Sequence, residues 1–211
     1  MKKSKQPGSG IDCWDASPDI YKVLIDDPVG KLVHMTMKPG QGDHAHDHAP
    51  HYMYIKKGGK LAIAHDGKTD EMEMPTGVGV ALPAGPHQVT NIGDDDVEVL
   101  FVEVTGELGE TPESHTSPFD TNPEHYKVLV EDDEWFVGQM SMTAGEEDAA
   151  HSHRDHFIYV LEGDGITLYP GKEKGEEKME VPIKPGMSIP VKAGWHVVVN
   201  SGTIPCKMIF W

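Results

Sequence analysis

The strongest constraint on the fold is that the sequence repeats itself. Residues 15–58 align without a gap with residues 120–163 when the numbering is shifted by 105. Farther along, the shift becomes 109, because the second copy has four more residues (109 − 105 = 4) in a charged loop after Tyr169. Two units of about 90 to 100 residues each match the usual size of a domain. The sequence therefore predicts two tandem domains, residues 15–104 and 120–211, joined by a polar linker at 105–119 and preceded by a flexible arm at 1–14.

Short segments with the composition of β-strands make up each copy. In the first copy these segments are residues 21–25, 31–37, 52–57, 60–65, 78–83, 87–92 and 97–104. Gly, Pro, Asp and Asn lie between them, which favours an antiparallel sandwich or barrel over alternating strands and helices. Asp66-Gly67 carries the signal of a two-residue hairpin turn. We therefore expect an all-β fold of two tandem barrels.

Histidines recur at fixed positions within the repeat. His46, His48 and His51 in the first copy correspond to His151, His153 and His156 in the second, at the offset of 105. A fourth pair, His87 and His196, follows at the offset of 109. Side chains alternate along a strand, so the first two histidines of each copy point to one face. We expect the third to return on the neighbouring strand and the fourth to arrive from across the sheet.

Imidazoles that converge inside an apolar barrel should be neutral and bound to a positive ion, since burial disfavours their charged form. Four imidazoles suit Fe(II), Mn, Zn, Ni or Cu. The sequence thus predicts one divalent transition metal in each barrel, with these ligands: His46, His48, His51 and His87 in the first, and His151, His153, His156 and His196 in the second. His44 lacks a counterpart and is expected outside the site. Asp47 and Asp155 are expected to be exposed turn carboxylates, with orientation of a histidine ligand as the alternative.

The pattern G-x5-H-x-H, a glycine after the third histidine, and a later G-x5-P-x-G-x-H-x3-N resemble the two motifs of the cupin superfamily. Two complete copies resemble a bicupin, over residues 15–104 and 120–211. The resemblance implies a jelly-roll barrel in each copy, with His46, His48 and His87, and His151, His153 and His196, as metal ligands. Cupins generally place a Glu where His51 and His156 stand, and Lys192 replaces a motif proline that Pro83 retains.

Composition argues against several partners. Lys and Arg total 18 against 35 Asp and Glu, a formal net charge of −17, so neither nucleic acid nor an anionic membrane is an expected partner. The sequence contains no apolar run of transmembrane or signal-peptide length. Cys13 and Cys206 are expected to be plain thiols. We therefore expect a cytoplasmic protein, and cupin barrels commonly pair through sheet edges, so a homodimer or an intrachain pseudo-dimer is also expected.

Three functions remain open. Four neutral ligands leave the full 2+ charge on a metal, which should attract a small anionic or dicarbonyl metabolite such as an enolate, a β-dicarbonyl or a hydroxy acid. The favoured prediction is an enzyme that acts on such a metabolite, a dioxygenase-like oxidoreductase before an isomerase or lyase, although no catalytic residue can be identified. The alternatives are a non-catalytic small-molecule or metal-binding cupin, and a pair of barrels in which the ions only stabilise the fold.

Overall fold

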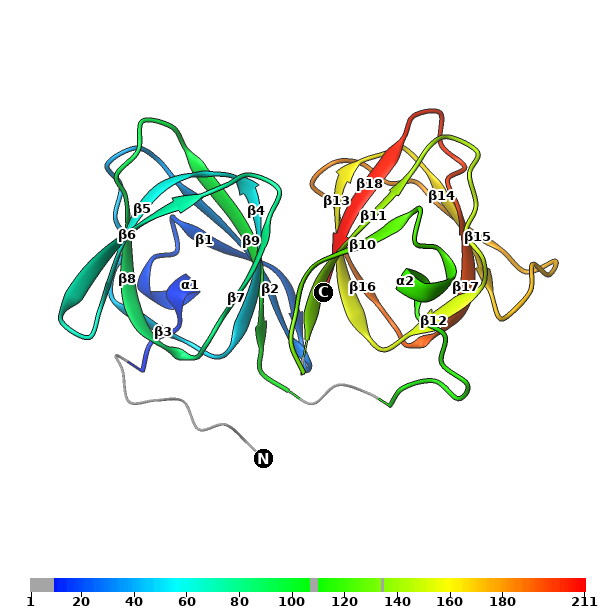
Figure 1. Ribbon diagram of the computed structural model, residues 1–211, viewed down its shortest axis with the longest axis horizontal. Coiled ribbons are helices and arrows are strands. Elements are labelled where there is room, and N and C mark those ends of the chain that lie inside the picture. The colour runs from blue at the N-terminus through cyan, green and yellow to red at the C-terminus, as the bar shows by residue number, and fades with distance from the viewer. Residues whose placement is uncertain (1–9, 107–109, 134) are drawn as a thin grey trace. The chain divides into compact units, whose positions relative to one another are not determined.

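The computed structural model describes residues 10–106, 110–133 and 135–211. The chain divides into two compact units, Met1–Gly106 and Glu107–Trp211. Within the described residues each unit contains nine strands and one four-residue helix (Figure 1). The all-β prediction is therefore confirmed.

Two facing sheets form the first unit. One has the strand order β1-β2-β9-β4-β7 and the other β3-β8-β5-β6. The strands are β1 (Tyr21–Asp27), β2 (Gly30–Met37), β3 (His46–His48), β4 (His51–Lys57), β5 (Gly59–His65), β6 (Lys68–Met74), β7 (Gly79–Leu82), β8 (Gly85–Asn91) and β9 (Val97–Val104).

The second unit repeats this topology strand for strand. Its sheets have the orders β10-β11-β18-β13-β16 and β12-β17-β14-β15. The strands are β10 (Tyr126–Glu131), β11 (Phe136–Met142), β12 (His151–His153), β13 (His156–Glu162), β14 (Ile166–Pro170), β15 (Met179–Val181), β16 (Ser188–Val191), β17 (Gly194–Val199) and β18 (Cys206–Phe210).

Equivalent registers show that the duplication extends to fine detail. Tyr21 pairs with Met35 across β1 and β2, and Tyr126 pairs with Met140 across β10 and β11. The register also shifts at the same place in both pairs, after Val23 and after Val128. A bulge at matching positions indicates that both copies use the same local bend to close the barrel.

The segments predicted from composition correspond to seven of the nine observed strands of the first copy. The other two, β3 and β6, were expected only through the alternation of His46 and His48 and through the hairpin turn. β3 has only three residues, and six of the seven residues of β6 are exposed, so neither gives the alternating pattern of a half-buried strand. The predicted hairpin is present between β5 and β6. Asp66 and Gly67 both have positive φ, 48° and 71°, as a primed two-residue turn requires.

The core of each unit lies between its two sheets. In the first it includes Met35, Ile55, Val99 and Phe101, and in the second Met140, Val160, Met208 and Phe210. Val97, Val99 and Phe101 alternate along β9, so Glu103 at the end of that strand also faces inward. An acidic side chain is thereby placed inside the first barrel.

The chain before β1 differs from the predicted flexible arm. Residues 1–9 lie outside the described residues, but α1 (Cys13–Ala16) begins inside the segment predicted to be flexible. Cys13 has no exposed surface, and Asp47 N–H donates to the Ile11 carbonyl oxygen at 2.9 Å. Burial of Cys13 and this pairing to β3 hold residues 10–14 against the first barrel.

The predicted linker is likewise partly structured. Residues 107–109 lie outside the described part, whereas α2 (Pro118–Thr121) begins within the linker and corresponds to α1 at the offset of 105. Ser152 N–H on β12 donates to the Thr116 carbonyl oxygen at 2.9 Å. None of the helices in the described part of the chain is both long and apolar enough to cross a bilayer.

Candidate metal centres

Three strands bring the four predicted histidines of the first barrel together. His46 and His48 lie on β3, and His87 on β8 lies directly opposite His46 in the antiparallel register. His51 lies on β4, which pairs with β7 and β9. The expectation that His51 returns on the neighbouring strand is therefore wrong: the turn at Ala49-Pro50 carries the chain into the facing sheet.

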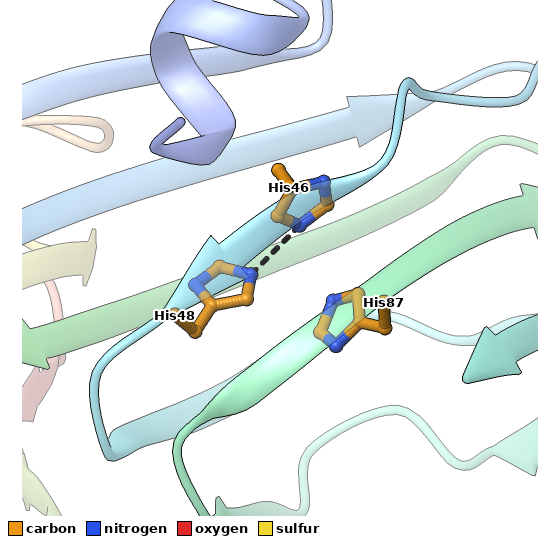
Figure 2. A group of neighbouring side chains, drawn as sticks. All are labelled: His46, His48 and His87. Carbon is orange, nitrogen blue, oxygen red and sulfur yellow. Dashed lines mark hydrogen bonds between the residues drawn. The ribbon is translucent and has the colours of Figure 1, made fainter. Parts of the chain in front are cut away.

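Three of these side chains form a close cluster (Figure 2). The candidate ligand atoms of His46, His48 and His87 all lie within 4.8 Å of one another, and the Nε2 atoms of His46 and His48 are 2.9 Å apart. The ring of His51 lies beside this group, with its centroid 4.3 Å from that of His48 and 6.3 Å from that of His87. His51 thus borders the cluster.

The Nδ1 atoms of the first-barrel histidines fix their tautomers. Nδ1–H of His46 donates to the His44 carbonyl oxygen at 2.8 Å, and Nδ1–H of His51 donates to the Ala49 carbonyl oxygen at 3.1 Å. Nδ1–H of His48 donates to Glu103 Oε2 at 3.1 Å. Since all three partners are acceptors, the proton of each neutral ring is on Nδ1, and Nε2 presents a lone pair.

Two facing lone pairs repel unless a cation lies between them. Two nitrogen ligands, each about 2.1 Å from an ion and at right angles to one another, are about 3 Å apart. The Nε2 separation of 2.9 Å between His46 and His48 matches this spacing. The residues present therefore fit a divalent metal, and the Nδ1 hydrogen bonds supply the orientation that metal-binding histidines need.

Burial keeps two of these imidazoles neutral. Desolvation, together with charge repulsion from neighbouring histidines, lowers the pKa of His51 to about 3 and that of His87 to about 2. A neutral imidazole is the form that binds a metal. His51 and His87 are thus in the form that binds a cation across the physiological pH range.

A buried Tyr-Asp pair, which the sequence analysis missed, supports the first histidine of the first barrel. Asp43 accepts from Tyr21 Oη–H at 2.5 Å and from Val89 N–H at 2.7 Å. The same carboxylate lies 3.6 Å from His46 Nδ1. The pair thus places a fixed acceptor behind the ring of His46.

The second barrel contains the equivalent pair. Asp148 accepts from Tyr126 Oη–H at 2.8 Å and from Val198 N–H at 2.6 Å, and it lies 3.4 Å from His151 Nδ1. Both members recur at the offset of 105, a signal in the sequence that could have revealed the two pairs.

Glu103 also lies beside the first cluster and was not predicted from the sequence. Its side chain is fully buried, lies opposite His51 in the β4–β9 register, and accepts from Ala49 N–H at 2.7 Å. Potential ligand atoms of Cys13, His48 and Glu103 also lie within 4.8 Å of one another. Strand alternation in β9 was the available signal, because it places Glu103 on the same face as Phe101.

The four histidines of the second barrel come from equivalent strands. His151 and His153 lie on β12, His196 on β17 pairs with His151, and His156 lies on β13. Nδ1–H of His151 donates to the Ala149 carbonyl oxygen at 3.2 Å, and those of His153 and His156 donate to the Arg154 carbonyl oxygen at 2.8 and 3.1 Å. The tautomer argument therefore holds here as well.

The second cluster is more open than the first. His196 lies between two histidines, with its Nε2 atom 3.0 Å from His151 Nε2 and its Nδ1 atom 3.3 Å from His153 Nε2. The ring centroids of His151 and His153 are 6.2 Å apart, against 4.7 Å for His46 and His48. One imidazole gives an ion a single nitrogen, so a shared ion requires one of these rings to turn.

Burial also lowers the pKa values of the four histidines in the second barrel. The pKa is about 4 for His151 and His153 and about 3 for His196, and it lies well below the usual value for His156. A cavity of about 380 Å³ opens onto all four of these side chains. The second site therefore combines neutral histidines with space for a ligand.

Three residues near the motifs show where sequence patterns succeeded or failed. His44 lies outside the cluster, as expected; it is exposed, and its Nδ1 atom lies 3.1 Å from Ser17 Oγ. Asp47 was expected to be exposed, but it is 3% exposed on β3, because α1 and the segment before it cover this strand. Asp155, also expected to be exposed, is half-buried and accepts from Ala193 N–H at 2.7 Å.

The two cysteines are free thiols, as expected, and both are buried. Burial raises the pKa of Cys206 to about 11 and also raises that of Cys13. Neither thiol is therefore ionised near neutral pH.

Sequence comparison identifies the family. A family model described as a cupin domain matches the chain twice, over residues 33–103 and 138–211. The chain belongs to the cupin family. It is a double cupin, and the two matches coincide with the two barrels described above. No curated protein matches the sequence.

Solved structures with the same double-cupin fold are distant in sequence. AerE from Microcystis aeruginosa is 12% identical with a TM-score of 0.59, over 90% of this chain and 95% of AerE. A mutant of salicylate 1,2-dioxygenase from Pseudoaminobacter salicylatoxidans is also 12% identical with a TM-score of 0.59, over 90% of this chain and 74% of the dioxygenase. A cupin 2 conserved barrel domain protein from Leptotrichia buccalis is 15% identical with a TM-score of 0.51, over 100% of this chain and 90% of that protein. At these identities the likeness concerns the fold.

Proposed function

We propose that this double cupin is a metal-dependent enzyme that acts on a small anionic oxygenated metabolite. Dioxygenase-like oxidoreductase chemistry is favoured, with isomerase or lyase chemistry as the other possibility. The observation that carries the proposal is the set of neutral histidines whose Nδ1–H groups are engaged by carbonyl or carboxylate oxygens, leaving Nε2 to bind a cation. The dioxygenase among the structural neighbours is consistent with such chemistry on this fold.

The ligand residues proposed for the metal are the histidines found on equivalent strands of the two barrels. They are His46, His48, His51 and His87 in the first, and His151, His153, His156 and His196 in the second. A divalent metal held there would supply Lewis acidity, and Fe(II) would add redox chemistry. Fe(II), Mn, Zn, Ni and Cu all suit imidazole donors, so the donor atoms do not select among them.

The protein's own groups would orient and shield the reacting centre. The carbonyl oxygens of His44 and Ala149 hold the rings of His46 and His151 through their Nδ1–H groups. Asp43 and Asp148 lie behind the same two rings, and each is fixed by a tyrosine hydroxyl. These contacts keep each ring in one orientation, so little reorganisation is needed when a substrate binds.

The oxygenase proposal is tested by anaerobic loading with Fe(II), followed by oxygen uptake with a panel of β-dicarbonyls and hydroxy acids. We expect oxygen consumption with at least one member of the panel, and no consumption by the protein loaded with Zn(II). An absence of product with every metal and every compound would remove the enzyme proposal.

The burial of the first cluster favours a second candidate function. His46 is 0%, His48 is 4% and His51 is 3% exposed, whereas His87 is half-buried, so three of the four rings are closed to solvent. A closed site suits an ion that stabilises the fold or is simply retained. A non-catalytic metal-binding or small-molecule-binding cupin would bind metal in both barrels and turn over nothing in the same assay.

A further inference from the structure

The cavity of the second barrel has an aromatic wall, formed by Phe119, Phe136 and Phe210, which we call the phenylalanine wall. Phe119 and Phe210 are stacked, with centroids 5.8 Å apart and an interplanar angle of 15°. Phe136 meets both rings edge-on, at 5.4 and 5.6 Å. A flat ring is the ligand shape that such a wall accommodates best.

Sequence differences between the copies create this wall. Gly138 lies behind the stacked rings, and a Cβ atom there would lie 2.6 Å from Phe210 Cζ and 3.0 Å from Phe119 Cζ. The equivalent position in the first copy is Val33, and Lys31 stands where the second copy has Phe136 (138 − 105 = 33 and 136 − 105 = 31). Trp14 and Phe101 stand at the other two wall positions of the first copy (119 − 105 = 14 and 210 − 109 = 101), so the first barrel lacks the third ring and the space that Gly138 leaves.

Charge at the cavity lining is also specific to the second barrel. Arg154, the single arginine of the chain, is exposed and lines the cavity, whereas Ala49 is its counterpart in the first copy. Its Nε–H donates to Thr111 Oγ1 at 2.6 Å, which fixes the guanidinium. A guanidinium has five donors, so others can be given to a ligand carboxylate.

Acidic side chains limit how an anion can lie in the cavity. Glu131, Asp132 and Asp133 also line it and are exposed, at the turn between β10 and β11. Their charge disfavours an anionic group near that turn and leaves Arg154 and the histidines as its partners. A volume of about 380 Å³ lies within the range of organic-ligand pockets and exceeds the needs of a five-carbon dicarbonyl.

We infer that the second barrel, rather than the first, binds the organic ligand of this protein, and that the ligand is an aromatic carboxylate. Its ring lies against the phenylalanine wall, and its anionic end lies toward Arg154 and the histidines. This inference deepens the proposed function and rests on it for the role of the ligand as substrate. The first barrel, in which three of the four histidines are buried, then serves the fold.

The test is a fluorescence titration of the full chain with 3-hydroxy-2-naphthoate, metal-free and Zn(II)-loaded. Leu168→Trp fills the cavity, and Ile63→Trp is its matched control at the same place in the first barrel (168 − 105 = 63). Arg154→Gln removes the charge at the cavity, and Lys22→Gln removes an exposed charge on β1. Circular dichroism and thermal melting verify that each variant is folded.

We expect the probe to bind, with affinity reduced at least tenfold by Leu168→Trp and changed less than twofold by Ile63→Trp. Arg154→Gln should weaken binding about tenfold, as the loss of a charge-assisted hydrogen bond predicts, with no change in melting temperature or metal content. Lys22→Gln should have no effect. Malonate, an anion without a ring, should not displace the probe at equal concentration.

Equal effects of the two tryptophan variants, no effect of Arg154→Gln, displacement by malonate, or no binding of the probe would each overturn the inference. The outcomes also separate it from the proposed function. Probe binding to the second barrel without oxygen consumption by any metal form would leave this inference standing and remove the enzyme. Oxygen uptake with aliphatic dicarbonyls, but no probe binding, would support the proposed enzyme and overturn this inference.

Discussion

At the scale of the residue, the hydrogen bonds of Nδ1 decide what each histidine can do. In both barrels a backbone carbonyl two residues earlier in the chain accepts from the first histidine, at 2.8 Å in His46 and 3.2 Å in His151. The ring can then offer only Nε2 to an ion. This local geometry makes the two sites chemically equivalent at their first histidine, although they differ in exposure elsewhere.

Substitution of these two histidines should divide the metal content between the barrels. His46→Ala and His151→Ala should each remove about half of the bound metal, and the double variant should remove nearly all of it, since each ion loses a ligand. His44→Ala, at an exposed ring outside the cluster, is the control and should bind as much metal as the wild type. The measurement is metal analysis of untagged protein. Unchanged metal in both single variants would show that these histidines are not ligands.

The tyrosine hydroxyls behind the sites should matter for stability. Tyr21→Phe and Tyr126→Phe each remove a donor to a buried aspartate, which should lower the free energy of unfolding by about 1 to 3 kcal/mol. Tyr169→Phe, at a half-buried ring beside Lys174, should change it by less than about 0.5 kcal/mol. Urea denaturation measures the differences. Similar values for all three variants would contradict a special role for the Tyr-Asp pairs.

At the scale of the element, the hairpin between β5 and β6 depends on a glycine. Gly67 has a φ of +71° with open space around its Cα, so a side chain there meets a backbone penalty and no clash. Gly67→Ala should therefore destabilise the protein by about 1 kcal/mol. Gly175→Ala, in the exposed loop between β14 and β15, is the matched control without a positive φ and should be neutral. Equal melting temperatures for the two variants would contradict this reading of the turn.

At the scale of the whole molecule, buried histidines should link stability to pH. Their pKa values in the folded chain, about 2 to 4 for His51, His87, His151, His153 and His196, lie below the value of about 6.5 for an unfolded histidine. The unfolded chain therefore takes up more protons as pH falls. The stability these groups contribute is present above pH 6.5 and is lost as pH decreases toward 4. Asp148, whose pKa burial raises to about 6, acts in the opposite sense and offsets part of the loss.

The metal-free protein should accordingly lose at least about 1 kcal/mol of stability between pH 6.5 and 5.5. Each proton that the unfolded chain binds in excess of the folded chain changes the free energy of unfolding by up to about 1.4 kcal/mol per pH unit. Bound metal should be released over about pH 6 to 5, because protons compete for the same nitrogens. Urea midpoints and metal content measured at a series of pH values provide the check. A midpoint that rises as pH falls through this range would contradict the neutral state of the buried histidines.

Charge and assembly also belong to the whole molecule. The net charge of −17 led us to predict no nucleic-acid or membrane partner. The resemblance to cupins, whose barrels commonly pair through sheet edges, led us to predict a homodimer or an intrachain pseudo-dimer. These stay predictions, as does a cytoplasmic location. Binding to anionic vesicles measures affinity for a membrane, and sedimentation analysis measures the oligomeric state.

Much of the fold and of the candidate ligand set could be predicted from the sequence, because both follow from local residue patterns and from the internal repeat. A period of two marks a strand, and a constant offset of 105 or 109 marks equivalent positions, so the two barrels and eight histidines followed without coordinates. Only the tertiary structure decided that His51 lies in the facing sheet, that Glu103 is buried against His48, and that the second barrel holds a cavity against its phenylalanine wall. These features depend on which distant strands pair and on how side-chain volumes fill the space between two sheets. Local patterns along the chain do not specify either.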